Sequence, residues 1–293
     1  MTTASNNSNS SILITGATGN IGSILAGRLA AQGVPFRALV RSSDNAEKIA
    51  GLPGAELVTG DLADKASVLA ALQGITHAFL LTNSSAQAEE LQLNFVAAAK
   101  EAGVQHIVKL SQLAADKQSP VRFLRYHAAV EEAIINSGIA YTFLRPNLFM
   151  QGFLSFRDMI LNKNMFIAAI GNAPVSVIDI RDIADVALAA LTQPGHENKT
   201  YTLTGPAALT HAQIADILSA STGKRIKFVD ITPEEMQQAV LSVGFPSWQA
   251  AGLIEDYAHY ARHEAAFITG TVAAITGTPA RNFEDFAQEY FTI

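Results

Sequence analysis

The stretch ILITGATGNIG at residues 12–22 decides the fold of this chain. The three apolar residues before Thr15 are typical of a short strand that is buried on both faces of a sheet. Glycines stand at positions 16, 19 and 22, and apolar residues then recur at helical spacing. A strand, a glycine-rich turn and a helix N-terminus together make a phosphate site, because the backbone can approach the anion and free N–H groups point at it. The stretch therefore predicts a pyrophosphate site, since an ordinary tight turn needs only one glycine.

Strands alternate with helices through the first half of the chain. The expected strands are residues 12–15, 35–41, 56–59, 77–81, 106–110 and 141–144. This alternation predicts an α/β fold of the Rossmann type, a doubly wound parallel sheet with helices on both faces. Ligands of such sheets lie beyond the carboxyl ends of the strands. We therefore expect the functional residues to follow these strands directly.

The second half of the chain is more mixed. Residues 12–150 are expected to form the nucleotide-binding domain, and residues 174–192 are expected to return to it as a strand over 174–180 and a helix. The remaining segments, 151–173 and 193–293, are expected to form a smaller, mixed α/β substrate-binding region. The two parts are predicted to be interleaved, because no long linker separates them.

Composition excludes several classes of protein. The 293 residues carry a formal charge of −6 without a long basic run, which argues against nucleic acid as a partner. The chain has no cysteine, and it lacks the run of about eighteen apolar residues that spans a membrane. Residues 1–11 lack the regions of a signal peptide and are expected to be a disordered lead-in. A cytoplasmic protein is therefore expected.

The residues after the second expected strand indicate which dinucleotide binds. Folds that prefer NAD usually place an Asp or Glu about twenty residues beyond the glycines, where it accepts from the ribose 2′-OH. Here Arg41 is followed by Ser42 and Ser43. A guanidinium and two hydroxyls suit a 2′-phosphate, which favours NADP(H). The alternative is a solvated Arg41, with Asp44 bound to the ribose.

A carboxylate follows the third expected strand. Asp61 could accept a hydrogen bond from the adenine amino group. Alternatively it could cap the next helix, although Asp64 is better placed for that role.

With these residues in place, the chain resembles the NmrA-like group of atypical short-chain dehydrogenases/reductases. The segments that carry the resemblance, besides the glycine turn and Arg41, are GDL at 60–62, SG at 137–138, LRPN at 144–147 and VIDIRDIA at 177–184. The group includes NADPH-dependent quinone reductases, triphenylmethane dye reductases and NADP-sensing transcriptional regulators. The resemblance covers nearly the whole chain, and it implies a Rossmann fold, a small C-terminal substrate domain and bound NADP.

The resemblance also implies roles for individual residues. The pyrophosphate would be held by Gly16, Thr18, Gly19, Asn20, Ile21 and Gly22. The rest of the cofactor would be contacted by Arg41 and Ser42 at the 2′-phosphate, Asp61 and Leu62 at the adenine, Leu81, Thr82 and Asn83 at the ribose, and Pro146, Asn147, Leu148 and Phe149 at the nicotinamide.

The chain departs from the wider superfamily at the catalytic residues. Typical members carry Tyr-x-x-x-Lys on the helix after the fifth strand, where the tyrosine donates a proton and the lysine lowers its pKa. Counting back from the Ser-Gly pair through Glu131 places His127 at the lysine position and Phe123 at the tyrosine position. If Tyr126 is taken as the tyrosine instead, Val130 stands where the lysine should be. Because neither register restores the pair, a conventional alcohol dehydrogenase or sugar epimerase is not expected. The resemblance to the NmrA-like group implies that positioning of hydride donor and acceptor dominates catalysis.

Three residues are candidates for contact with the substrate: Ser111, Tyr126 and His127. His127 and Glu131 lie one helical turn apart and could touch. His127 would then donate to a substrate carbonyl, or the pair would be a structural hydrogen bond. Ser111 could bond a substrate oxygen or the nicotinamide ribose, or simply cap its strand.

No metal site is predicted. His259 and His263 have a spacing that zinc sites use, but a solvated helix face explains them more simply. The expected function is hydride transfer from NADPH to a quinone-like or other conjugated acceptor, by a monomer or homodimer. The alternative is a non-catalytic NADP(H)-sensing regulator that binds a protein partner.

Overall fold

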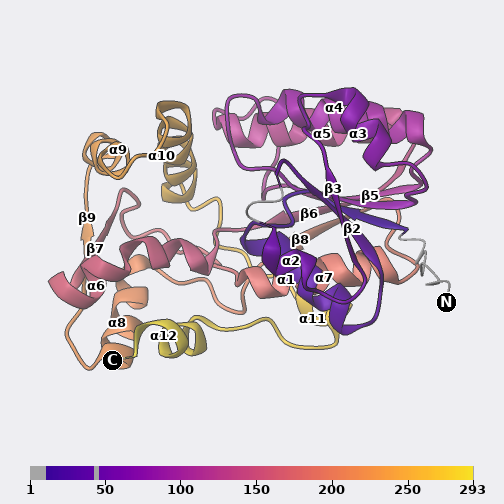
Figure 1. The fold of residues 1–293 in the computed structure, drawn as a ribbon. Coiled ribbons are helices and arrows are strands. Elements are labelled where there is room, and N and C mark those ends of the chain that lie inside the picture. Colours follow the sequence, from indigo (N-terminus) through magenta and orange to yellow (C-terminus); the bar gives the residue numbers. More distant parts are fainter. Residues whose placement is uncertain (1–10, 43–45, 293) are drawn as a thin grey trace.

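The computed structural model describes residues 11–42 and 46–292, which form a parallel sheet between two helical layers and a smaller second module (Figure 1). The sheet has seven strands, all parallel, in the order β3 (Ala55–Thr59), β2 (Phe36–Val40), β1 (Ile12–Ile14), β4 (His77–Leu80), β5 (His106–Leu110), β6 (Ala140–Pro146) and β8 (Lys199–Leu203). The six strands expected in the first half are confirmed. The strand order reverses between β1 and β4, which is where doubly wound sheets bind ligands.

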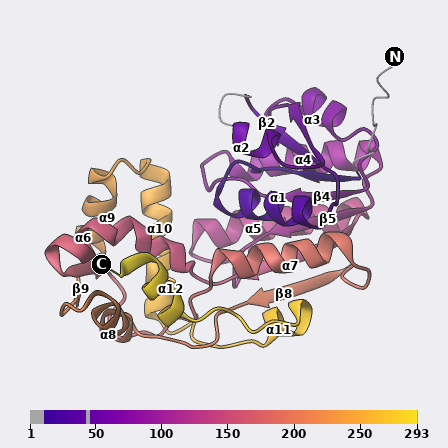
Figure 2. The same cartoon turned by 60° about the horizontal axis from the view of Figure 1, so that its bottom comes forward.

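Helices cover both faces of the sheet (Figures 1 and 2). One layer consists of α1 (Asn20–Ala31), α2 (Glu47–Ala50), α7 (Ile180–Thr192) and α11 (Thr271–Thr276), and the other of α3 (Lys65–Ala71), α4 (Ala88–Ala102) and α5 (Arg122–Ser137). Strand β1 contributes to the cores on both faces of the sheet. Ile12 and Ile14 pack into the core beneath α1, while Leu13 packs into the core beneath α3, α4 and α5. This alternation confirms that β1 is buried on both faces.

The second module lies beside the sheet and has a core of its own. It consists of the 3₁₀ helix η2 (Met150–Phe156), α6 (Arg157–Lys163), β7 (Met165–Ala168), α8 (His211–Thr222), β9 (Lys227–Asp230), α9 (Pro233–Ser242), α10 (Ser247–Ala261) and α12 (Phe283–Phe291). Strands β7 and β9 pair in parallel, so the module is mixed α/β as expected. No helix within residues 11–42 and 46–292 is long and apolar enough to cross a membrane.

The expected strand over 174–180 is wrong. This segment forms only isolated bridges, Val175 with Leu209 and Ile178 with Phe149, and β8 takes the place beside β6. Its alternating apolar residues have another cause, because Val175 packs into the core of the second module while Ile178 packs into the core beneath α1. The segment crosses between two cores, which produces the pattern of a buried strand without a sheet partner. The helix expected after it is confirmed as α7.

Asn147, which directly follows β6, connects the end of that strand to the segments that contain Ser176 and Ala265. Its side-chain nitrogen donates to Ser176 Oγ at 2.8 Å and to the carbonyl oxygen of Ala265 at 2.9 Å, and its backbone N–H donates to the carbonyl of Leu203. Its side-chain oxygen accepts from the backbone of Leu148. The buried amide therefore fixes the point at which the chain leaves the sheet.

We expect Asn147→Ala to lower the free energy of unfolding by about 1–3 kcal/mol, because buried partners lose their hydrogen bonds. The measurement is urea denaturation without cofactor. The control is Asn83→Ala, an exposed site where a change within about 0.5 kcal/mol is expected. Equal stability of the two variants would contradict a structural role for Asn147.

Candidate active site

The three glycines of the turn are required for different reasons. Gly16 has a φ of 63°, which favours glycine, and a Cβ on Gly22 would lie 2.1 Å from the carbonyl oxygen of Gly16. Both are therefore needed for the turn to pack against α1. Gly19 differs, because its φ is −82° and a Cβ there would meet only the oxygen of Gly16 at 3.3 Å. A side chain at this position would require a shift of a few tenths of an ångström, so the fold itself constrains residue 19 less than residues 16 and 22. An anion bound at the start of α1 would add the requirement for glycine at residue 19.

The N-terminus of α1 offers hydrogen-bond donors to an anion. Gly19 is the N-cap residue, no side chain of the described residues caps the helix, and the first turn carries no acidic residue. Thr18, Gly19 and Asn20 are exposed. The positive end of the helix dipole therefore lies at an exposed turn, with Ile21 and Gly22 buried behind it, and this arrangement fits a pyrophosphate.

Arg41 lies directly after β2, the strand beside β1, and so on the same edge of the sheet as the glycine turn. Its side chain is exposed, and no residue of the described ranges forms an ion pair with it. Ser42 follows at the same edge, while Ser43 and Asp44 lie outside the described residues. A guanidinium in this position is available to a phosphate.

Asp61 follows β3, one strand farther from the turn. Its Oδ1 accepts from the backbone of Ala63 at 2.9 Å, which holds the carboxylate in a local turn. Asp64 caps α3 by accepting from Ala66, as the sequence predicts. Leu62, which follows Asp61, is half-buried against the core under α3 and α4.

The end of β4 is hydrogen-bonded to Thr15, the residue that precedes the glycine turn. Thr15 Oγ1 donates to the carbonyl of Leu81 at 2.8 Å and accepts from the Leu81 N–H at the same distance. Thr82 Oγ1 accepts from Gln92, and Asn83 is exposed beyond it. The structure thus brings the predicted ribose residues beside the predicted pyrophosphate residues.

The predicted nicotinamide residues follow β6 and lie between the sheet and the second module. Pro146 and Asn147 are buried, and Leu148 and Phe149 are half-buried. The Asn147 amide is taken up by the structural bonds described above, so its side chain leaves no free polar atom for a ligand.

Ser111 and Tyr126 both have protein partners. Ser111 Oγ donates to Glu131 at 2.5 Å, and Glu131 also binds Arg145 through two hydrogen bonds. The Tyr126 hydroxyl lies 3.0 Å from Ser84 Oγ, and burial raises the pKa of Tyr126 to about 12. Tyr126 is therefore a weak proton donor, since no lysine lowers its pKa as in the Tyr-x-x-x-Lys arrangement.

His127 does not bond to Glu131, as the sequence had suggested it could. Its Nδ1 lies 2.8 Å from Nζ of Lys109, which extends from β5, and its ring packs against that of Tyr126 at 4.2 Å between centroids. Burial, together with the nearby Lys109 and Arg145 cations, holds the pKa of His127 well below its usual value. His127 is therefore a neutral imidazole. Lys109 was missed by sequence reasoning, and its only signal is a lysine inside the otherwise apolar end of a buried strand.

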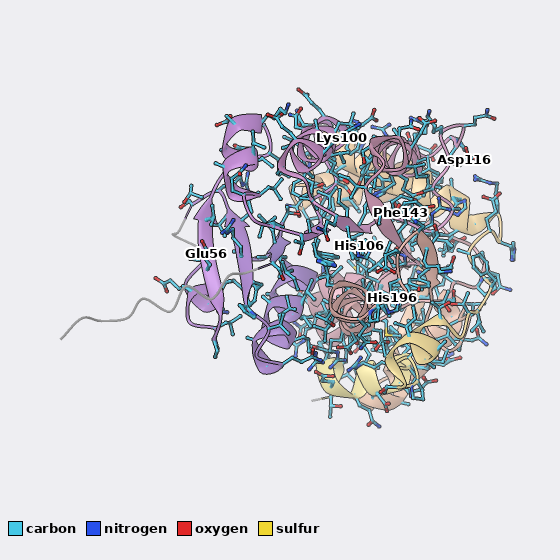
Figure 3. The ribbon with its side chains drawn as sticks, turned by 90° about the vertical axis from the view of Figure 1, so that its right-hand side faces the viewer. Glu56, Lys100, His106, Asp116, Phe143 and His196 are labelled. Carbon is cyan, nitrogen blue, oxygen red and sulfur yellow. The ribbon has the colours of Figure 1, made fainter. Side chains whose placement is uncertain are left out.

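A second polar cluster lies at the amino ends of the strands and is structural. His106 Nε2 is 2.9 Å from Thr142 Oγ1, and Thr142 donates to the carbonyl of His196. Figure 3 labels His106 and His196, together with Phe143 on the neighbouring strand. Burial lowers the pKa of His106 to about 4, so this histidine is neutral at physiological pH.

The expected solvated face around His259 is wrong. His259 and Asp256 are buried, with exposed fractions of 5% and 6%, because this side of α10 packs inward. Asp256 accepts from Gln112, and His259 Nδ1 pairs with Glu264 at 2.5 Å. His263 lies beyond the end of α10 and does not join this pair.

The fold and the glycine turn can now be compared with known proteins. A model of the NmrA-like family matches residues 8–285. The chain belongs to the NmrA-like family.

Two similar proteins, and a third that is similar in fold alone, are described below. The chain is 38% identical to an NAD(P)H azoreductase from Xenophilus azovorans over 279 residues, covering 95% of this chain and 97% of the relative. A crystal structure of the NADPH-dependent quinone oxidoreductase of Escherichia coli, complexed with NADPH, superposes with a TM-score of 0.88 at 29% identity, covering 96% of this chain and all of that one. The negative transcriptional regulator NmrA, in complex with NADP, shares the fold at 21% identity and a TM-score of 0.79, with 97% of this chain and 96% of that one covered.

We expect Gly19→Val to fold normally but to lose NADPH binding, because its side chain would occupy the space of the pyrophosphate. Binding is measured by calorimetry and folding by thermal denaturation. Gly27→Val is the matched control, since a Cβ on Gly27 in the same helix meets nothing within 4 Å. Near-native affinity in Gly19→Val would exclude the turn as the pyrophosphate site.

We expect Arg41→Ala to weaken NADPH binding by about 1.5–3 kcal/mol, the contribution of a hydrogen bond to a charged group. NADH lacks the 2′-phosphate, so its affinity should change little and serves as the internal control. Calorimetric titration with both cofactors gives the comparison. If both affinities fall equally, Arg41 does not bind the 2′-phosphate.

Proposed function

We propose that this protein is an NADPH-dependent oxidoreductase that transfers hydride to a quinone-like, azo or other conjugated acceptor. The observation that carries the proposal is the pairing of an exposed glycine turn with Arg41 on the same edge of the sheet, where no residue of the described ranges 11–42 and 46–292 forms an ion pair with Arg41. One part suits a pyrophosphate and the other a 2′-phosphate. When bound, NADPH supplies the hydride.

The residues at the strand ends would hold the cofactor in the order in which their strands lie. Asp61 and Leu62 would contact the adenine, and Leu81 to Asn83 would line the ribose. Pro146 to Phe149 would form the wall beside the nicotinamide, with the Asn147 side chain supporting the backbone of that wall. The chain's own contribution to the reaction is then to bind and orient two reactants at one edge of the sheet.

The polar groups near β5 favour a conjugated acceptor over an isolated ketone. A ketone needs an acid as hydride arrives, but Tyr126 is a weak acid and the Ser111 hydroxyl is bonded to Glu131. A quinone or azo acceptor delocalises the negative charge that develops, so that water can protonate it afterwards. His127 is the remaining candidate, and as a neutral imidazole it can donate a hydrogen bond.

The family also contains NADP-binding regulators, so turnover is the property to be tested. A reductase oxidises NADPH steadily when an acceptor is present. A regulator would bind NADPH with similar affinity but would not oxidise it with any acceptor.

We expect quinones and azo dyes to be reduced faster than simple ketones, measured as kcat/KM with NADPH. Tyr126→Phe and His127→Ala should each lower kcat by at most about a hundredfold, the low end for loss of a general acid. A loss of about ten thousandfold, the upper end of that range, would show a dedicated proton donor. Fast oxidation of a secondary alcohol with NADP would exclude the proposed acceptor class.

A further inference from the structure

Lys109 is buried in a place where its charge requires an explanation. It is the only lysine among residues 11–42 and 46–292 with a buried side chain, and its exposed fraction is 0%. It stands one residue before the end of β5, and its amino group extends towards α5. A buried ammonium group is unfavourable unless it has close partners.

The partners of Lys109 are few and well defined. Its Nζ donates to the carbonyl oxygen of Leu110 at 3.0 Å and lies 2.8 Å from Nδ1 of His127. Glu131 lies nearby but is bonded to Ser111 and Arg145. The imidazole of His127 is therefore the only side chain in the described structure that is hydrogen-bonded to the Lys109 amino group.

This contact determines which nitrogen of His127 carries the proton. An ammonium group has three donors and no acceptor, so Nδ1 must accept and the ring proton must lie on Nε2. No described residue bonds to Nε2, and Nε2 is not among the fully buried atoms that lack a partner. The Nε2–H group therefore has no protein partner among the described residues, and His127 keeps a small exposed fraction of 8%, while the Tyr126 ring packed against His127 limits its rotation.

We propose that Lys109 is a positioning residue that holds His127 in its Nε2–H tautomer, so that His127 presents a hydrogen-bond donor to the acceptor atom that gains charge when hydride arrives. The inference rests on the proposed reductase function and adds to it the reason why His127 carries its proton on Nε2. Typical short-chain dehydrogenases take their lysine from the helix after the fifth strand, whereas this chain takes it from the strand itself. The lysine acts on an imidazole instead of a tyrosine.

The ionisable groups that face Lys109 determine how the pair responds to pH. They are His127 and Glu131 from α5 and Arg145 from β6. Burial lowers the pKa of Lys109 to about 7, since the attraction of Glu131 only partly offsets it and Arg145 lowers it further. Glu131 and Arg145 stay paired, and His127 stays neutral because its pKa is far lower.

Lys109 is therefore the group of this cluster that titrates near neutral pH. Below its pKa it is an ammonium group and enforces the Nε2–H tautomer. Above its pKa the neutral amine can accept from Nδ1–H, and the enforcement is lost. Turnover should accordingly be highest below the pKa of Lys109 and should fall as pH rises through it.

The experiment compares wild type with Lys109→Met, His127→Ala and the double variant. Lys109→Met should lower kcat by about tenfold to a hundredfold, as for loss of the partner that orients a functional histidine. It should leave the affinity for NADPH unchanged and abolish the fall in kcat at alkaline pH. In the His127→Ala background, which leaves no side-chain acceptor for the lysine, Lys109→Met should have no further effect, because Lys109 acts through His127.

Nitrogen NMR of the histidine rings provides a readout that does not depend on activity. The signals of His127 are identified among the seven histidines by their loss in His127→Ala. Wild type below pH 7 should show the Nε2–H tautomer, and Lys109→Met should show a mixture. If Lys109→Met does not fold, Lys109→Arg, which stays charged and has donors only, should retain the tautomer and lose the fall in kcat at alkaline pH.

Three results would overturn the inference. The first is an Nδ1–H tautomer of His127 in wild type. The second is a double variant whose loss of kcat is the product of the two single losses. The third is a fall in kcat at alkaline pH that persists in Lys109→Met. Absence of NADPH oxidation by wild type with every acceptor would instead refute the proposed function. The NMR experiment would still decide whether Lys109 sets the tautomer.

Discussion

The structure of this protein depends on the contact between the backbone of Gly22 and the carbonyl of Gly16. A side chain on Gly22 would place an atom 2.1 Å from that oxygen, so the first helix can lie against the first strand only because both residues are glycines. This contact directs the N-terminus of α1 outward. Thr15 then ties the turn to Leu81 at the end of β4. The phosphate-binding geometry is therefore a property of the backbone.

The polar side chains at the other end of the site satisfy one another. Ser111, Glu131 and Arg145 form one buried group, and Tyr126 with Ser84 forms another. Such groups fix the orientation of α5 over β5 and β6, because breaking them would leave buried atoms unpaired. As a result, few polar side chains at this end of the site remain free to act on a ligand.

Sequence predicts those parts of this structure that local pattern determines. The strands of the first half were found because each is an apolar run that ends in a polar or glycine residue, and the edge of the sheet that carries the site follows from them. The strand over 174–180 was wrong because burial between two cores gives the same alternation as a sheet. Lys109 was missed because its partner lies 18 residues away on a different element, and no local periodicity reports such a pair. His259 was misjudged for the same reason, since its burial comes from packing of α10.

The path of the chain between the sheet and the second module has a consequence for how each half is built. The chain enters the second module after β6 and returns through residues 174–180 to α7. It crosses again after β8, after α10 and after α11. Because the chain crosses between the two halves so often, each half is assembled from segments that are separate in the sequence. No single cut in the gene would therefore release either half as a continuous polypeptide.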